Sequence, residues 1–176
     1  MKALMMLFVC MLLTTGCNEE SAPPAPKAAA VASAEKLPAE LFTSTAPANA
    51  IDVVAARNSV KDGETVVIKA RIAGAKEPFA PNRAILTVAD LSLPTCDQTP
   101  NDNCPTPWDA CCVPSEEIAT KIVAVQVVGA DGRPLKSTLA GANGLAPLKQ
   151  VVIAGVMHKS DGNGTPIIEA KQIFVP

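Results

Sequence analysis

Four cysteines are the residues of this chain whose type and spacing could do chemistry. They follow one another as C-x7-C-x6-C-C, in a segment that also holds the single tryptophan: Cys96, Cys104, Cys111 and Cys112. Thiols can pair as disulfides, bind soft metal ions or exchange electrons. The 176 residues include one histidine, His158, and no tyrosine, so the usual general acids and bases are scarce. We therefore expect a protein that is not an enzyme.

Two structural disulfides are the state that we predict for these thiols. An exported protein meets an oxidising compartment, and four cysteines pair evenly. A bridge between the adjacent Cys111 and Cys112 is strained. Cys96 and Cys104 are therefore expected to pair with these two, in either order. Each short closure is worth about 2–3 kcal/mol in the chain-entropy account.

Metal binding and thiol redox chemistry are the two alternatives for the same cysteines. Four thiolates can hold Zn²⁺ or Cu⁺. Zinc sites, however, favour C-x2–4-C pairs, and His158 lies far away in the sequence. Thiol redox proteins commonly use C-x-x-C, which this segment lacks. We expect no metal and no other cofactor.

The tryptophan between the second and third of these cysteines has two interpretations. Trp108 stands among prolines. In the first interpretation it is a plug that packs the cysteine-rich segment onto the rest of the domain. In the second it is an exposed anchor for a partner, because tryptophan is enriched in interface hot spots.

The N-terminus has the features of a bacterial export signal. Met1-Lys2 is a short positive start, and the apolar run from Ala3 to Leu13 has the length of a signal-peptide core. Thr14-Thr15-Gly16-Cys17 then resembles the bacterial lipobox, with Thr14 where that pattern prefers leucine. The resemblance implies that residues 1–16 are removed, that Cys17 is diacylglycerylated and that its new amine is acylated. Several acyl chains anchor a protein stably.

The lipobox resemblance implies that the protein is located in the bacterial cell envelope. There it is held by a lipid anchor and faces the periplasm. Residue 18 is Asn rather than Asp. By resemblance to the sorting rule of enteric bacteria, this favours the outer membrane.

Residues 17–50 are expected to be a flexible tether. From Asn18 to Ala50 there are five prolines and eleven alanines in 33 residues. Such a composition buries too little apolar surface to offset the entropy of ordering. Leu41-Phe42 is the exception, and docking of this pair onto the domain is the alternative.

From residue 51 onward the pattern is that of short strands separated by turns. A helical turn is expected from Ile51 to about Asn58, and a short helix from Pro134 to Ala140, with Pro134 at its start and Gly141 as its stop. Runs of β-branched residues predict five strands: Thr65–Ile72, Arg83–Ala89, Lys121–Val128, Gln150–Met157 and Ile167–Val175.

This order of elements, β-β-β-α-β-β, resembles the OB-fold, a small five-stranded barrel. The segment DGETVVIKARIAG resembles the first strand of many OB domains, and PLKQVVIAGVMHKSDGNGTPIIEAKQIFV resembles their last hairpin. An immunoglobulin-like sandwich is the alternative, but it needs about seven strands. We therefore predict an all-β barrel over residues 51–176. Its expected core is Val66, Ile68, Ile72, Ile85, Leu86, Val88, Ile122, Val125, Val127, Leu139, Val151, Ile153, Val156, Ile168 and Phe174.

The cysteine-rich insertion, residues 91–117, joins the second and third predicted strands. Its CPTPWDACC stretch is similar to loops of uncharacterised bacterial lipoproteins, a resemblance that implies no activity. With 15 basic and 17 acidic residues, the chain lacks the basic excess of nucleic-acid-binding proteins. We therefore expect an envelope lipoprotein with a non-enzymatic OB-like module that binds a protein or glycan. The alternative is a metal-binding or thiol-redox protein.

Overall fold

The computed structural model describes residues 34–100, 103–159 and 164–176. The predicted signal peptide, the predicted lipidation site Cys17 and residues 18–33 of the predicted tether lie outside these ranges.

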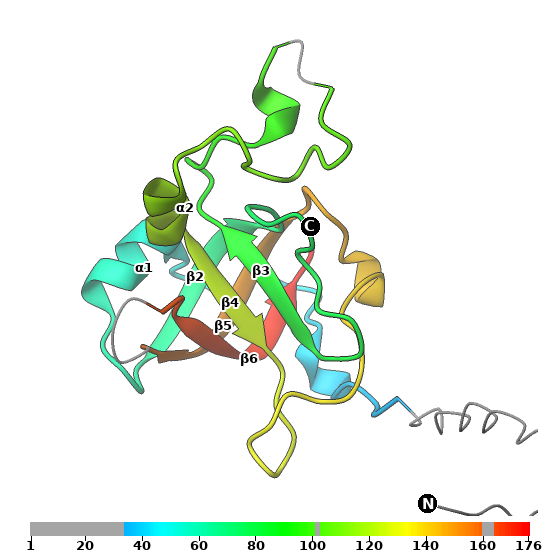
Figure 1. The fold of residues 1–176 in the computed structure, drawn as a ribbon. Helices are drawn as coiled ribbons and strands as arrows, with labels where there is room; N and C mark the ends of the chain where they lie inside the picture. Colours follow the sequence, from blue (N-terminus) through cyan, green and yellow to red (C-terminus); the bar gives the residue numbers. More distant parts are fainter. Residues whose placement is uncertain (1–33, 101–102, 160–163) are drawn as a thin grey trace, which may run out of the picture. The chain divides into compact units, whose positions relative to one another are not determined.

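The described chain folds into a small all-β barrel of the OB-like type (Figure 1). Five longer strands form its wall: β2 (Thr65–Arg71), β3 (Ile85–Ala89), β4 (Ile122–Gln126), β5 (Gln150–His158) and β6 (Ile167–Phe174). Their order is β2-β3-β4-β6-β5, and the pairing of β5 with β2 closes the barrel. A sixth strand, β1 (Ile51–Asp52), pairs in parallel with β2. All five predicted strands are confirmed, with ends shifted by one or two residues. The fold is the predicted barrel and not the alternative, an immunoglobulin-like sandwich.

Two short α-helices lie beside the barrel wall. Helix α1 (Val53–Ser59) confirms the predicted helical turn. Helix α2 (Ser115–Lys121) was not expected and takes up the last residues of the predicted cysteine-rich insertion. Single turns of 3-10 helix complete the fold: η1 (Ala39–Leu41), η2 (Cys96–Gln98) and η3 (Ala142–Gly144).

The predicted helix from Pro134 to Ala140 is wrong. Pro134 forms a bridge to Val128, and the N–H of Leu135 donates to the carbonyl of Val127 at 3.0 Å. The carbonyl of Leu135 accepts the N–H of Ala84 at 2.9 Å. Partners on neighbouring segments therefore satisfy this backbone, and a local helix has no advantage there.

The packed domain begins before the expected boundary at residue 51. Leu41 is 1% exposed and belongs to the barrel core. Phe42 pairs with Ile173 of β6, and the N–H of Thr43 donates to the carbonyl of Ile173 at 3.0 Å. Residues 34–50 are therefore part of the domain rather than of the tether, because the apolar pair Leu41-Phe42 packs onto the barrel.

The barrel core contains eleven of the fifteen predicted residues. Phe174 is only partly buried, because β6 has a bulge: Ala154 of β5 faces Gln172 and Gly155 faces Ala170. The extra residue, Lys171, shifts the alternation, so Ile173 points into the core instead. The other three predicted residues that are only partly buried are Ile85, Ile122 and Val156.

Candidate functional site

The Cys loop, residues 91–114 between β3 and α2, extends from one end of the barrel (Figure 1). Two of its segments lie side by side. The N–H of Cys96 donates to the carbonyl of Asp109 at 2.8 Å, and the N–H of Asp97 donates to that of Pro107 at 2.9 Å. These bonds hold the start of η2 against the stretch that leads to Cys111.

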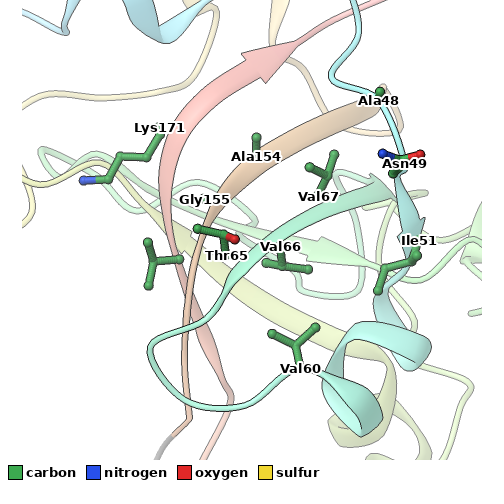
Figure 2. A pocket seen from close by; sticks show the side chains of 11 residues that line it. Ala48, Asn49, Ile51, Val60, Thr65, Val66, Val67, Ala154, Gly155 and Lys171 are labelled. Carbon is green, nitrogen blue, oxygen red and sulfur yellow. The ribbon is translucent and has the colours of Figure 1, made fainter.

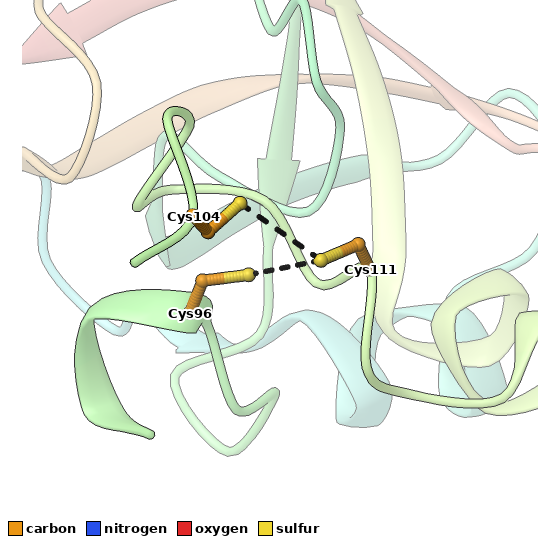
Figure 3. Close-up of side chains that lie close together, drawn as sticks. All are labelled: Cys96, Cys104 and Cys111. Atoms are coloured by element: carbon orange, nitrogen blue, oxygen red, sulfur yellow. Dashed lines mark hydrogen bonds between the residues drawn. The ribbon is translucent and has the colours of Figure 1, made fainter. Parts of the chain in front are cut away.

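Three cysteine sulfurs gather at this place (Figure 3). The Sγ atoms of Cys96 and Cys111 are 3.3 Å apart, and those of Cys104 and Cys111 are 3.9 Å apart. The three Sγ atoms all lie within 4.8 Å of one another. We call Cys96, Cys104 and Cys111 the thiol triad. The sulfur of Cys112 is 3.9 Å from that of Cys111.

The described cysteines form no disulfide in this structure. A sulfur–sulfur bond is about 2.05 Å long, and the shortest of the distances above is 3.3 Å. The sequence predicted that Cys96 and Cys104 pair with Cys111 and Cys112, in either order, and in the structure Cys111 lies beside both Cys96 and Cys104. The two disulfides stay a prediction for the oxidised protein.

The thiol triad spans the boundary between protein interior and solvent. Cys96 is 3% exposed, Cys104 is partly buried and Cys111 is exposed. Burial, and then the contact with Cys111, raises the pKa of Cys96 to about 12. Hydrogen bonds between the Cys104 thiol and the side chain and backbone of Thr106 lower the pKa of Cys104. The contact with Cys96 lowers the pKa of Cys111, but its contacts with Cys112 and Cys104 raise that pKa overall.

Below the triad, a small apolar cluster fixes the loop to the barrel. Its buried members are Ala73, Ala89, Leu93 and Ala110. Trp108 packs against them and is tied at both ends: its indole N–H donates to the carbonyl of Lys76, and its own carbonyl accepts the N–H of Gly74, both at 3.0 Å. These contacts support the interpretation of Trp108 as a plug.

Two buried charged residues support the base of the loop, and the sequence analysis missed both. Arg71 is 9% exposed, and its guanidinium donates to the carbonyl of Leu93 at 2.9 Å. The carboxylate of Asp90 accepts the N–H groups of Val54 and Ser92, each at 2.9 Å. Burial raises the pKa of Asp90, but these hydrogen bonds outweigh it and lower that pKa overall. In the sequence, the signal that could have identified these two residues was a charged side chain at the end of an apolar strand.

A shallow apolar groove on the barrel wall is the second feature of interest (Figure 2). Its volume is about 430 Å³, and it is lined by residues of β1, β2 and β5 that include Ile51, Val67 and Val156, with Lys171 at its edge. The groove is open to solvent, and its lining is mostly apolar, with Asn49, Thr65 and Lys171 as its polar residues.

His158 lies on the surface at the end of β5, as expected. Its Nε2 is 3.5 Å from a carboxylate oxygen of Glu169, and its side chain is 43% exposed. Glu169 also contacts Lys171, which holds the pKa of this carboxylate below its usual range. His158 is far from the triad in sequence, and the cation-ligand cluster found among the described residues does not include it.

Among the described residues, no helix is both long and apolar enough to cross a membrane. Comparison of the chain with protein-family models, curated proteins and solved structures gave no match.

Proposed function

We propose that this protein is a lipid-anchored lipoprotein of the bacterial cell envelope. Cys17 carries the lipid anchor, which lies in the outer membrane. The barrel domain faces the periplasm. The support is in the sequence: a positive start, an apolar run of signal-peptide length, and small residues before Cys17. The barrel is a non-enzymatic binding module, and the Cys loop is its binding element.

The observation that carries the binding role is the separation of two apolar clusters. The barrel core runs from Leu41 to Ile173, and among the described residues it includes none between Val88 and Val123. The loop instead has its own cluster around Leu93 and Ala110. No described loop residue therefore contributes to the barrel core, and loops of this length in a compact domain are usually functional or linker segments. Its proposed partner is an envelope protein or a glycan.

A second candidate function uses the thiols themselves, for metal binding or redox chemistry. It is favoured by the triad, whose sulfurs are too far apart for the 2.05 Å of a disulfide and close enough to share an ion. Oxidation would give the predicted disulfides instead. In that state the 3.3 Å contact favours Cys96–Cys111 as the first pair, which leaves Cys104 for Cys112.

Fatty-acid labelling tests the anchor. Cells that express the full chain are fed an alkynyl fatty acid, and the label is detected on the purified protein. Wild-type protein should be labelled and processed, whereas Cys17→Ser should be unlabelled and keep residues 1–16. Cys112→Ser, which leaves the N-terminus intact, is the matched control and should be labelled like the wild type. Equal labelling of the wild type and Cys17→Ser would show that the anchor proposal is wrong.

A loop-replacement variant tests the module. Residues 94–107 are replaced by a short Gly/Ser turn, which leaves Leu93, Trp108 and Ala110 in place. The barrel should keep its far-UV circular dichroism and unfold cooperatively, because none of the loop residues that the structure describes belongs to its core. Loss of the barrel fold in this variant would mean that the loop is a structural element and not a mounted binding element.

A further inference from the structure

We infer that the thiol triad binds one copper(I) ion through three thiolates, from Cys96, Cys104 and Cys111. The inference rests on the second candidate function, metal binding by the thiols of the Cys loop, and specifies the ion.

The sulfur separations are the first argument. A metal–thiolate bond of about 2.3 Å places the sulfurs of a trigonal site about 4.0 Å apart and those of a tetrahedral site about 3.8 Å apart. The Cys104–Cys111 separation is already 3.9 Å. The Cys96–Cys111 separation of 3.3 Å must grow by about 0.7 Å to reach the trigonal value, but must shrink by about 1.2 Å to form a disulfide. The arrangement is thus nearer to a metal triangle.

The number and kind of ligands select the metal. Thiolates are soft ligands, which favour Cu⁺ and Zn²⁺ over hard cations. Structural zinc sites almost always have four ligands. In the part of the chain that the structure describes, the candidate ligand group consists of three cysteines and includes no histidine or carboxylate. The sulfur of Cys112 lies 3.9 Å from that of Cys111, but Cys112 is not a member of the group of three whose sulfurs all lie close to one another. Three soft ligands therefore point to copper(I).

The loop holds these ligands in place before an ion arrives. Cys96 is buried, and its N–H is bonded to the carbonyl of Asp109, two residues before Cys111. The Thr106 hydroxyl lies 3.4 Å from the sulfur of Cys104. One edge of the triad is thus fixed in the protein, while the exposed Cys111 and the partly buried Cys104 leave a path for the ion.

Binding is a proton exchange without electron transfer. Three neutral thiols and one Cu⁺ give a complex of net charge −2, and three protons leave to solvent. The positive charge of the ion offsets the mutual repulsion of the three thiolates. Copper stays in the +1 state throughout, so no oxidant or reductant takes part.

Copper(I) titration of the full mature chain tests the inference. The protein is solubilised from membranes in detergent under anaerobic, reducing conditions and titrated with Cu⁺ against a chromophoric chelator. We expect one equivalent to bind, with thiolate-to-copper absorption in the ultraviolet. X-ray absorption should show three sulfurs at about 2.3 Å.

Single serine variants identify the ligands. Loss of an outer-shell partner of a metal ligand weakens metal binding about 10–100-fold. Loss of a ligand itself should weaken copper binding by more than that, and this is the expected result for Cys96→Ser, Cys104→Ser and Cys111→Ser. Cys112→Ser is the matched control and should still bind one equivalent with wild-type affinity. Thermal unfolding of each apo-protein shows whether the variant is folded, and Cys104→Ser and Cys111→Ser are the decisive pair because their positions are not deeply buried.

Several results would overturn the copper site. They are binding of less than one equivalent, stronger binding of Zn²⁺ in the same competition, and an effect of Cys112→Ser equal to that of Cys111→Ser. Fatty-acid labelling of the same samples separates the proposals. Labelled protein without copper overturns the copper site alone, and unlabelled protein that binds copper overturns the anchor alone.

Discussion

The carboxylate of Asp90 caps helix α1 from 36 residues away. Its Oδ2 accepts the N–H of Val54 at 2.9 Å, in the first turn of the helix. Asp52 stands at the N-cap position itself, but its side chain makes no capping bond and contacts Lys69 at 3.4 Å instead. Asp90 also accepts the N–H of Ser92 at the start of the Cys loop. One buried carboxylate thus joins α1, the end of β3 and the base of the loop.

Replacement of Asp90 should therefore destabilise the domain more than replacement of the acid next to the helix. Asp90→Ala leaves the partly buried N–H of Val54 without its acceptor, which costs about 1–3 kcal/mol. Asp52→Ala, the matched control, removes only an exposed ion pair worth at most about 1 kcal/mol. Urea denaturation of both variants measures the difference. Equal losses would show that Asp90 is not the cap that matters.

Asp90 should also make the domain sensitive to acid. Its pKa is lowered in the folded state, so its contribution to stability is complete above the pKa of the unfolded chain, about 4. The contribution is lost as the pH falls from there through the lowered folded pKa. The free energy of unfolding should thus fall more steeply below about pH 4 in the wild type than in Asp90→Asn. Denaturation at a series of pH values between neutral and acid measures both slopes, and parallel curves would contradict this assignment.

Leu41 should be worth as much to the fold as a residue of the barrel strands. Its side chain is 1% exposed in the core, so Leu41→Ala should cost about 2–5 kcal/mol. Glu40→Ala changes the neighbouring, exposed residue of the same 3-10 turn and should be close to neutral. Thermal unfolding compares the two. A neutral Leu41→Ala would restore the boundary at residue 51 that the composition suggested.

The sequence predicted the strands well because their β-branched runs are local signals. It missed features that depend on partners distant in the chain. Leu41 stands in a stretch rich in alanine and proline, and only its contact with β6 makes it core. Leu139 was correctly predicted to be buried, but the helix proposed to bury it is absent, because Pro134 and Leu135 pair with residues 127 and 128 and with Ala84.

At the candidate site, the sequence predicted which residues meet but not how. The sequence left open which of Cys111 and Cys112 lies beside Cys96 and which lies beside Cys104. The sulfur–sulfur separations of 3.3 and 3.9 Å depend on the backbone pairing of Cys96 with Asp109. These separations are what distinguishes a site suited to a disulfide bond from one suited to a shared metal ion. Nothing in the local sequence specifies that pairing.

Gly155 is a position where the close approach of β5 and β6 requires glycine. A Cβ there would lie 2.3 Å from the carbonyl oxygen of Glu169, at the bulge around Lys171. Gly155→Ala should therefore push the backbones of β5 and β6 apart. It should lower the free energy of unfolding by at least the cost of ordinary overpacking, about 1–3 kcal/mol. Gly132→Ala is the control: nothing lies within 4 Å of its Cβ, and it pays only for a φ of +73°, roughly 1–2 kcal/mol. Chemical denaturation gives both values, and a smaller loss for Gly155→Ala would contradict the steric account.

Trp108 should hold the Cys loop on the barrel, and a graded set of variants measures how. Trp108→Ala removes the ring from the cluster around Leu93 and Ala110, which should lower the free energy of unfolding by about 2 kcal/mol, since the ring is only partly buried. Trp108→Phe keeps most of that packing and loses the indole hydrogen bond, at about 1 kcal/mol. Lys76→Ala is the matched control, because the bond goes to the backbone carbonyl of Lys76 and survives the substitution.

The effect of Trp108→Ala should be local, and hydrogen exchange can resolve it. The amides of Gly74 and Cys96 are bonded across the loop, to the carbonyls of Trp108 and Asp109, so their protection should fall. The amides of β5 that pair with β2 belong to a core that includes none of the described loop residues, and they should keep their protection. Unchanged protection at Gly74 and Cys96 would mean that Trp108 does not hold the loop. Its partly buried ring would then be explained better as a contact for a partner, and binding of an envelope protein or glycan would become the measurement to make on Trp108→Ala.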